Sequence, residues 1–462
     1  MSTSSAELET GAADEAHERL LTGWGRTAPS RAEVVEPHTA DDVAEALAGA
    51  GPRGALARGL GRSYGDAAQN AGGRVLAMSL LAAVREIDEE AGEATVDAGV
   101  SIEQLVQLLV PMGFFVPVTP GTWHVTVGGA IAADVHGKNH HRDGSFCDHV
   151  VWFELLTPAG ERVRLARGDE LFDATAGGMG LTGIVLSARL RLLRVESAYM
   201  TVDRERAGDL DDAMARMSAR DDEYRYSVAW IDCLARGRSL GRSVLIRGDH
   251  AGADLAPAGR GNGALAVPGG TKLAAPPWTP PGLLRRSTVR IFNEAYYRSA
   301  PVSEIGRIEH MRPFFWPLDS VRNWNRIYGP SGFLQYQLVV PFGREDALRE
   351  SLERLSGSGC PSFLAVLKRF GAQQGLLSFP VEGWTLALDV PAAVPGLGPL
   401  LDGLDELVAE AGGRVYLAKD SRLRPDLLEA MYPRLPEWRA IVERADPRGV
   451  MRSDLSRRLG LR

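Results

Sequence analysis

The chain has 462 residues, enough for two to three domains that each bury a hydrophobic core. Its composition, with 45% hydrophobic and 24% charged residues, is that of a globular protein. The formal net charge of −7 gives no general attraction to nucleic acid or to anionic lipid, so we expect small molecules as partners.

The cysteine pattern and the N-terminal segment bear on the location of the protein. Cys147, Cys233 and Cys360 are far apart and include no CxxC pair, which indicates neither a metal site nor a disulfide framework and favours a reducing compartment. Residues 2–19 are polar and acidic, unlike a secretory signal, and no apolar run reaches transmembrane length. We therefore expect a cytoplasmic protein, and contact with a membrane surface stays open.

The predicted elements follow one another without a regular strand–helix–strand repeat. One helix begins after Thr39, with Asp42 in capping-box spacing, and ends by Gly51, while a second begins after Ser101, with Gln104 at the reciprocal position. Hydrophobic stretches of strand length cover 55–57, 75–78, 84–87, 94–98, 150–156 and 162–165. This mixture favours an α+β fold over a doubly wound sheet.

A change of composition near Glu196 predicts a domain boundary, because the glycine-rich character of the chain ends there. We expect residues 1–196 to form one domain and 197–415 a second, with 416–462 returning to the first. The segment 251–282 is rich in Ala, Gly and Pro and shows little periodicity. It is predicted to be a mobile loop or lid without regular hydrogen-bonded structure.

Three glycine-rich strings in the first domain predict a nucleotide cofactor. The first, 58–66, follows a predicted strand, and its glycines let backbone N–H groups approach a phosphate. In the second, 126–137, Gly128 and Gly129 begin an apolar helix whose free N–H groups would face a pyrophosphate. The third covers 177–184. The first string alone also fits an ordinary tight turn and lacks the Rossmann spacing, but three such loops together favour a dinucleotide.

In this order, the glycine loops resemble the FAD-binding domain of the vanillyl-alcohol oxidase, or p-cresol methylhydroxylase, family. Within that family, strings along nearly the whole chain resemble the branch that oxidises polyprenyl-phosphate ribose: GWGRTAPS at 23–30, ARGLGRSYGD at 57–66, HGKNHH at 136–141, GFLQYQ at 332–337 and YLAKDSR at 416–422. The resemblance implies a two-lobed FAD domain with a mixed α+β substrate (cap) domain.

The resemblance also implies a reaction. FAD would accept a hydride from C2 of a lipid-linked ribosyl group, giving a 2-keto sugar. This is the first half of an epimerisation to arabinose for cell-wall arabinan, which a partner NAD-dependent keto-reductase would complete. Carried over by position, the residues implied to bind FAD are Ala57, Arg58, Gly59, Leu60, Gly61, Arg62, Ser63, Tyr64, Gly65, Asp66, Ala67, Gly121, Thr126, Val127, Gly128, Gly129, Ala133, Asp134, Val135, His136, Ile184 and Tyr416.

Other matched positions are implied to face the substrate. The resemblance gives catalytic roles to Lys419, His136 and Tyr64, and substrate-binding roles to Lys138, Trp230, Trp316, Gln335, Gln337, Lys368, Thr385 and Ala387. Period-two alternation in 333–337 puts both glutamines on one strand face, where they can bind sugar hydroxyls or simply face solvent. Lys419 would end a strand over 415–418, where its ammonium either stabilises charge on a reduced flavin or lies at the surface.

Several positions limit what the resemblance carries over. Arg62 stands where many relatives have a histidine that bonds FAD covalently, so we expect non-covalent FAD. Thr385 and Ala387 replace an asparagine and a cysteine common among the closest family members, and Trp316 replaces a tyrosine. The sugar specificity is therefore left open. The spacing of His136, His140 and His141 does not predict a metal site, since no carboxylate or cysteine completes the set.

Two alternatives to the lipid-linked substrate are kept. The first is an FAD-dependent oxidase of a soluble sugar or alditol, against which the absence of a covalent tether counts. The second is a flavin-binding scaffold without turnover, against which Lys419 counts.

Overall fold

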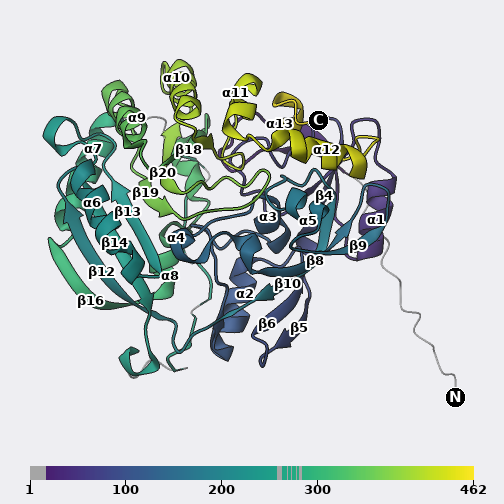
Figure 1. The fold of residues 1–462 in the computed structure, drawn as a ribbon, viewed down its shortest axis with the longest axis horizontal. Helices are drawn as coiled ribbons and strands as arrows, with labels where there is room; N and C mark the ends of the chain where they lie inside the picture. Colours follow the sequence, from purple (N-terminus) through teal and green to yellow (C-terminus); the bar gives the residue numbers. More distant parts are fainter. Residues whose placement is uncertain (1–16, 258–262, 268, 272, 277, 280–283) are drawn as a thin grey trace.

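The computed structural model describes residues 17–257, 263–267, 269–271, 273–276, 278–279 and 284–462. Two groups of sheets lie side by side in it (Figure 1): small sheets from the N-terminal part of the chain, and one large sheet from its middle and later parts. Helices and mixed sheets together confirm the α+β class. No described helix is both long enough and apolar enough to cross a membrane.

The N-terminal part contains two main sheets. The first has the strand order β1-β2-β4-β3, with β1 (His17–Leu21), β2 (Ser30–Val35), β4 (Arg74–Ala77) and β3 (Ala55–Arg58). The second is antiparallel in the order β5-β6-β10-β8-β9, with β5 (Val84–Asp88), β6 (Glu93–Asp97), β10 (Ile184–Arg191), β8 (Val150–Leu156) and β9 (Arg162–Ala166). A short pair joins β7 (Phe114–Phe115) to β11 (Leu193–Arg194). The helices here are α1 (Ala40–Ala48), α2 (Ile102–Leu109), α3 (Val127–Ala132), α4 (His140–Asp143) and α5 (Glu170–Thr175).

An eight-stranded sheet forms the second group. Its order is β16-β12-β14-β13-β19-β20-β18-β21, with β16 (Ser303–His310), β12 (Tyr199–Ala207), β14 (Ser243–His250), β13 (Tyr226–Ile231), β19 (Ala365–Phe370), β20 (Gly383–Pro391), β18 (Phe333–Pro341) and β21 (Arg414–Val415). Its accompanying helices are α6 (Leu210–Arg220), α7 (Arg286–Ser299), α8 (Met311–Phe315), α9 (Glu345–Ser358) and α10 (Leu397–Glu410). The strands from β12 onward thus belong to other sheets than the strands before them, and a domain boundary near residue 196 stays a prediction.

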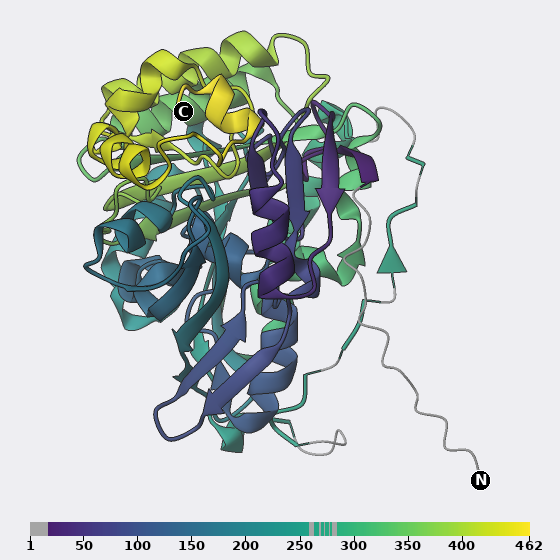
Figure 2. The ribbon, with the colours of Figure 1, turned by 90° about the vertical axis from the view of Figure 1, so that its right-hand side faces the viewer.

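The last helices return to the N-terminal sheets. In Figures 1 and 2 the yellow helices α11 (Pro425–Met431), α12 (Leu435–Ala445) and α13 (Asp454–Arg458) lie beside the purple and blue elements. The indole N–H of Trp438 on α12 donates to the carbonyl of Ala174 on α5 at 2.8 Å. The C-terminal segment therefore packs against the N-terminal part of the chain.

Most of the predicted local structure is confirmed. Thr39 and Ser101 each form the expected capping box, with Asp42 and Gln104. The first helix ends earlier than predicted, at Ala48, where Gly49 takes the cap position. The predicted strand over 415–418 is wrong, since β21 ends at Val415 and the chain then turns, with the amide of Lys419 donating to the carbonyl of Tyr416 at 2.9 Å.

The segment 251–282 is described only in part, because residues 258–262, 268, 272, 277 and 280–282 lie outside the described residues. Its described portion contains some regular structure, contrary to prediction: a 3₁₀ turn at Ala253–Leu255, and β15 (Leu273–Ala274), which pairs with β17 (Val321–Arg322). The Thr271 hydroxyl also donates to the carbonyl of Asp319 at 2.6 Å. A role of this segment as a lid stays a prediction.

Arg458 on α13 joins two loops that meet at the centre of the molecule. Its guanidinium donates to the carboxylate of Asp66, in the first glycine loop, and to that of Asp420, each at 2.8 Å. Asp420 is buried. Without Arg458 its carboxylate would keep its desolvation cost and lose a charged partner.

We therefore predict that Arg458→Ala lowers the free energy of unfolding by about 2 kcal/mol, the scale of a hydrogen-bonded charged partner. Urea denaturation of the FAD-loaded protein measures this change. The control is Arg439→Ala, which removes an exposed ion pair with Glu429 and should cost less than about 1 kcal/mol. Equal stability of the two variants would contradict the proposed clamp.

Candidate active site

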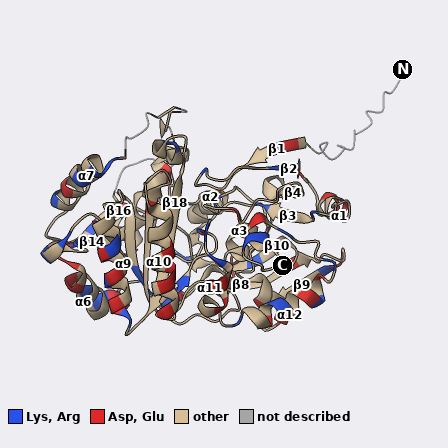
Figure 3. Ribbon diagram, turned by 90° about the horizontal axis from the view of Figure 1, so that it is seen from above, with Lys and Arg blue, Asp and Glu red and all other residues tan. Residues whose placement is uncertain are grey.

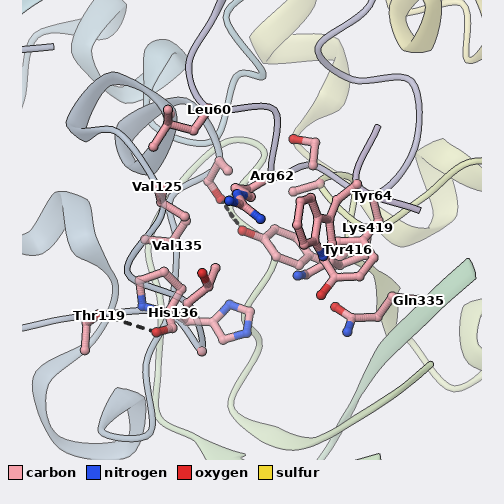
Figure 4. Close-up of a pocket in the computed structure, with 18 of the residues that line it drawn as sticks. Leu60, Arg62, Tyr64, Thr119, Val125, Val135, His136, Gln335, Tyr416 and Lys419 are labelled. Atoms are coloured by element: carbon pink, nitrogen blue, oxygen red, sulfur yellow. Dashed lines mark hydrogen bonds between the residues drawn. The ribbon is translucent and has the colours of Figure 1, made fainter. Parts of the chain in front are cut away.

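One long cavity lies between the N-terminal sheets and the large sheet. Its lining includes parts of all three glycine strings on one side and residues of β13, β18, β19 and β20 on the other. Figure 4 shows labelled side chains from these separate segments pointing toward a common space. Segments more than three hundred positions apart in the sequence therefore build one site.

The first glycine loop offers a row of backbone donors. None of the N–H groups of residues 59–63 donates a hydrogen bond to any part of the chain that the structure describes, and all five residues line the cavity. Gly61 has a φ of +64°, in the left-handed region that favours glycine. Unpaired N–H groups of this kind form an anion-binding concavity, which fits the diphosphate of FAD.

Two arginines of this loop have different roles. Arg58 faces away from the cavity and holds the loop, donating to the carbonyls of Ala68 at 2.7 Å and Thr22 at 2.8 Å. Arg62 lines the cavity with its guanidinium over the Trp24 ring, 3.7 Å from the centroid. Its buried Nε has no partner among the described residues, and burial lowers its pKa. Arg62 is thus a cation facing the FAD site.

The second glycine string forms a helix as predicted, but its first N–H groups are already used. Val127 donates to the carbonyl of Val100 at 2.9 Å and Gly128 to that of Ala98 at 2.8 Å. Gly129 donates to the Thr126 hydroxyl at 3.2 Å. The expectation that these N–H groups are free for a pyrophosphate is therefore wrong. Gly128 and Gly129 instead let the helix approach its neighbours closely while its open side lines the cavity.

The glycine strings touch one another. A Cβ on Gly59 would lie 2.2 Å from the Thr126 hydroxyl oxygen, so the first and second strings approach to a distance that only glycine permits. The third string packs on the end of α3, where the amide of Met179 donates to the carbonyl of Ala132 at 2.9 Å. Met179, Gly180 and Gly183 from this string line the cavity.

Tyr64 and Lys419 meet at the centre of the site. The Tyr64 amide donates to the carbonyl of Ala418 at 2.9 Å, and the Lys419 Nζ lies 3.9 Å from the centroid of the Tyr64 ring. Gly65 makes this approach possible, since a Cβ there would lie 2.0 Å from the Asp420 carbonyl oxygen. A cation over an aromatic ring in a buried place is a favourable arrangement.

A buried carboxylate lies behind Lys419. Asp389 on β20 is fully buried and accepts a hydrogen bond from the Gln335 amide and another from the Tyr328 hydroxyl at 3.3 Å. Burial lowers the pKa of Lys419, and the neighbouring Asp389 raises it again. Burial also raises the pKa of Asp389 itself. The Lys419 charge therefore depends on a carboxylate that lies outside the cavity lining.

One face of the large sheet provides the opposite wall. Trp230, Val366, Ala387 and Gln337 are directly opposed in register across β13, β19, β20 and β18, and all four line the cavity. This confirms that Gln335 and Gln337 share a strand face in the cavity. The Gln337 amide donates to the Thr385 hydroxyl at 3.2 Å, so Thr385 lies behind the lining and orients Gln337.

His136 is held by the same glutamine. The Gln337 amide nitrogen lies 2.9 Å from His136 Nε2 and, as oriented, donates to it. His136 Nδ1 is buried and has no partner among the described residues. Burial, followed by the positive charge of Lys368, holds the pKa of His136 well below its usual range. His136 is therefore neutral, and its buried Nδ1–H has no acceptor among the described residues.

Two further lysines face the cavity near His136. The Lys138 ammonium donates to the carbonyl of Phe314, and its pKa falls to about 7 because of burial, with a smaller contribution from Lys368. Burial also lowers the pKa of Lys368, to about 8. Three lysines that share one desolvated space form a strong site for an anionic ligand, whose charge would favour their protonated forms.

Most residues implied by the resemblance line the cavity, and eight do not. Those outside the lining are Arg58, Gly65, Asp66, Val127, Asp134, Ile184, Trp316 and Thr385. Trp316 is 1% exposed and packs in the core, where its indole N–H donates to the Thr119 hydroxyl at 3.0 Å. Asp134 is buried beneath the site and accepts from the Cys147 amide at 3.1 Å. These residues support the lining from behind.

Sequence reasoning missed several residues of the site. Thr119, Val228, Ile246, Tyr296 and Trp324 line the cavity without belonging to any motif, and Trp24 lines it from the string at 23–30, where no role was predicted for it. Asp389 and Tyr328 were also missed, because they lie outside the lining: Tyr328 donates to Asp389, and Asp389 acts on the site by accepting from Gln335 and by raising the pKa of Lys419. Period-two alternation around Val228 and Ile246 could have suggested a buried sheet face, but not that this face meets a cofactor.

The comparisons with known proteins agree with this geometry. Residues 32–166 match a family model described as an FAD binding domain. The decaprenylphosphoryl-β-D-ribose oxidase of Mycolicibacterium smegmatis is 43% identical over 451 residues, which cover 96% of this chain and 98% of that protein. The chain belongs to the decaprenylphosphoryl-β-D-ribose oxidase family. It is an FAD-dependent oxidoreductase, as the resemblance implied.

Two further relatives match this chain over different shares of its length. An uncharacterised protein of Streptomyces coelicolor, from the mprA 5′ region, is 44% identical over 372 residues, 78% of this chain and all of that protein. An alditol oxidase of a Streptomyces species is 29% identical over 174 residues, 37% of this chain and 41% of its own. The alditol oxidase therefore resembles this chain over little more than a third of its length, so it gives limited support to a soluble alditol as substrate.

The FAD of this family member should be released by acid or heat as the free dinucleotide. Arg62 occupies the place of the tethering histidine, and a guanidinium forms no such bond. Precipitation of the denatured protein followed by absorbance of the supernatant measures release. Yellow colour that stays with the precipitate would overturn this prediction.

Gly59→Ala should reduce the FAD content of the purified protein, because the added methyl group would lie 2.2 Å from the Thr126 hydroxyl oxygen and push two glycine strings apart. The ratio of flavin to protein absorbance measures the loss. Gly51→Ala is the control, since a Cβ there meets nothing within 4 Å. Full FAD content in Gly59→Ala would show that the contact between the strings is dispensable.

Asp389→Asn should move the alkaline limit of flavin reduction to lower pH. Asp389 raises the pKa of Lys419, so its removal lets that pKa fall, and the ammonium is then lost at a lower pH. Asparagine can still accept from Gln335. Rapid-mixing reduction rates across pH test the shift, with Asp402→Asn, an exposed partner of Arg422, as control. If the alkaline limit of Asp389→Asn equals that of the wild type, Asp389 does not raise the pKa of Lys419.

Proposed function

We propose that this chain oxidises the C2 hydroxyl of a polyprenyl-phosphate ribose to the 2-keto sugar. The reaction would be the first half of an epimerisation to arabinose for cell-wall arabinan. The observation that carries the proposal is the composition of the cavity. It combines a basic end with an apolar wall, as a phosphate-linked sugar on a hydrocarbon tail requires.

The basic end accounts for the polar half of such a substrate. Lys138 offers its ammonium group to a phosphate. Gln335 offers hydrogen bonds to sugar oxygens, and the His136 ring forms part of the lining. The catalytic role of Tyr64 is to hold Lys419 in place through the contact of its ring with the ammonium.

The apolar wall accounts for the lipid half. Val228, Trp230, Ile246, Tyr296, Leu364 and Val366 are apolar members of the lining, and Lys368 follows two positions after Val366 on β19. A soluble sugar or alditol would leave this wall without a partner. The wall therefore favours the lipid-linked substrate over the soluble alternative.

FAD supplies the hydride acceptor when it is bound. Lys419 lines the cavity, and its positive charge would stabilise the negative charge that develops on the acceptor in the transition state. The C2 hydroxyl must lose its proton as the hydride leaves C2. His136 Nε2 is engaged by Gln337, so the proton would pass to the neutral amine of Lys368, whose pKa burial lowers to about 8.

Further parts of the proposal concern organisation and partners. Residues 1–196 with 416–462 would form the FAD-binding domain, and 197–415 the substrate domain. A partner NAD-dependent keto-reductase would convert the 2-keto product, and we propose a cytoplasmic location for this step. The change of sheet at β12 supports the domain division.

The yellow protein should be bleached under anaerobic conditions by a polyprenyl-phosphate ribose and not by free ribose or an alditol. The phosphate and the tail each meet their own part of the cavity, so free sugars lack most of the binding energy. Flavin absorbance after mixing measures the bleaching. Faster bleaching by an alditol would establish the soluble-substrate alternative instead.

A further inference from the structure

Helix α7 (Arg286–Ser299) is at once a wall of the cavity and part of the molecular surface. Tyr296 lines the cavity, and its ring centroid lies 4.6 Å from that of Trp230. One turn earlier, the Phe292 ring stacks 6.1 Å from Tyr296 and is 45% exposed. An aromatic series therefore runs from the interior of the site to the solvent.

Exposed apolar side chains concentrate in the part of the sequence that contains this helix. Six of the twelve large hydrophobic residues that are exposed in the described chain fall between positions 273 and 305: Leu273, Trp278, Ile291, Phe292, Val302 and Ile305. Ile291 is 71% exposed, on the side of α7 opposite its buried residues Val289 and Asn293. Such a concentration marks an interaction surface.

The N-terminal part of α7 adds positive charge, from its N-cap residue to its second turn. Arg285, Arg286 and Arg290 are exposed and line one shallow hollow. Their guanidinium groups form no hydrogen bond or ion pair with the described residues, whereas Arg298 at the other end pairs with Glu294. Arg285 at the N-cap and Arg286 at the first helical position oppose the helix dipole, so they do not stabilise the helix itself.

These charges stand out from the rest of the surface. Figure 3 shows Lys and Arg mixed with Asp and Glu over α6, α9 and α12, and many of these pair with one another. The whole chain carries a net charge of −7. An unpaired basic cluster beside exposed apolar side chains is the pattern of a helix that lies in the interface of an anionic bilayer.

We propose that α7 docks this protein on an anionic membrane surface. Ile291 and Phe292 would enter the boundary between headgroups and acyl chains, while the three arginines bind lipid phosphates. Because Tyr296 is also a wall of the cavity, the tail of a membrane-held substrate would pass along Phe292 and Tyr296 without meeting water. The docking itself needs no turnover, and only the passage of the tail rests on the proposed function.

Vesicle co-sedimentation of the FAD-loaded protein tests the docking. The wild-type chain should bind phosphatidylglycerol vesicles more tightly than phosphatidylcholine vesicles. Replacement of Arg285, Arg286 and Arg290 by Gln should weaken binding to phosphatidylglycerol on the order of 100-fold, about fivefold for each charge. Ile291→Ser, at a side chain 71% exposed, should weaken binding to both vesicle types.

The matched control removes three charges elsewhere. Arg349, Arg434 and Arg439 lie on α9 and α12 and are paired with acidic residues; their replacement by Gln should leave vesicle binding within about twofold of wild type. FAD content and flavin reduction by a short, water-soluble substrate analogue should be unchanged in both triple variants, which shows that they fold.

The outcomes separate the docking from the proposed reaction. Absence of wild-type binding to phosphatidylglycerol, or equal binding by the α7 triple variant, would overturn the docking. So would self-association through α7, seen as a dimer in light scattering that Ile291→Ser abolishes. Vesicle binding by a protein that no polyprenyl-phosphate sugar bleaches would sustain the docking and sink the proposed reaction alone.

Discussion

The contact between residues 416–420 and the first glycine loop is the constraint on which the site depends. The Tyr64 amide bonds to the carbonyl of Ala418, and Gly65 lies against the Asp420 carbonyl where no side chain fits. Arg458 then ties Asp66 to Asp420. This single junction closes the chain, sets Lys419 over Tyr64 and defines one end of the FAD cavity. The junction requires the charged side chains of Arg458, Asp66 and the buried Asp420, and each would be unfavourable there without its partners.

Burial is also what makes the site chemically active. Lys138, Lys368 and Lys419 would be ordinary cations in water, but the cavity lowers the pKa of each. They therefore gain more from an anionic ligand than exposed lysines would, and a neutral fraction is available near neutral pH to accept a proton. At Lys419, the neighbouring Asp389 opposes the lowering of the pKa by burial. The same cavity thus binds charge and moves a proton.

Local sequence patterns predicted much of this structure. Capping residues located α1 and α2, alternation located β18, and the glycine strings located the cofactor side of the cavity. The resemblance added the lining residues Lys138, Trp230, Gln335, Gln337, Lys368, Ala387 and Lys419 on the substrate side, while many other lining residues were not predicted. Asp389 could not be predicted because its importance arises from register with Gln335 across β18 and β20. The free N–H groups were expected in the second loop as well as the first, and the contact of Gly128 with Ala98, which is a tertiary one, could not be read from spacing.

The central claim is that the cavity presents C2 of a polyprenyl-phosphate ribose to the hydride acceptor. Rapid-mixing reduction of the FAD-loaded protein by substrate deuterated at C2 tests it most directly. The account predicts slower reduction with deuterium at C2 than with hydrogen there, and no change with deuterium at C3, because only the C2–H bond breaks with the hydride. Equal rates for the two C2 isotopologues together with a slower C3-deuterated substrate would contradict it.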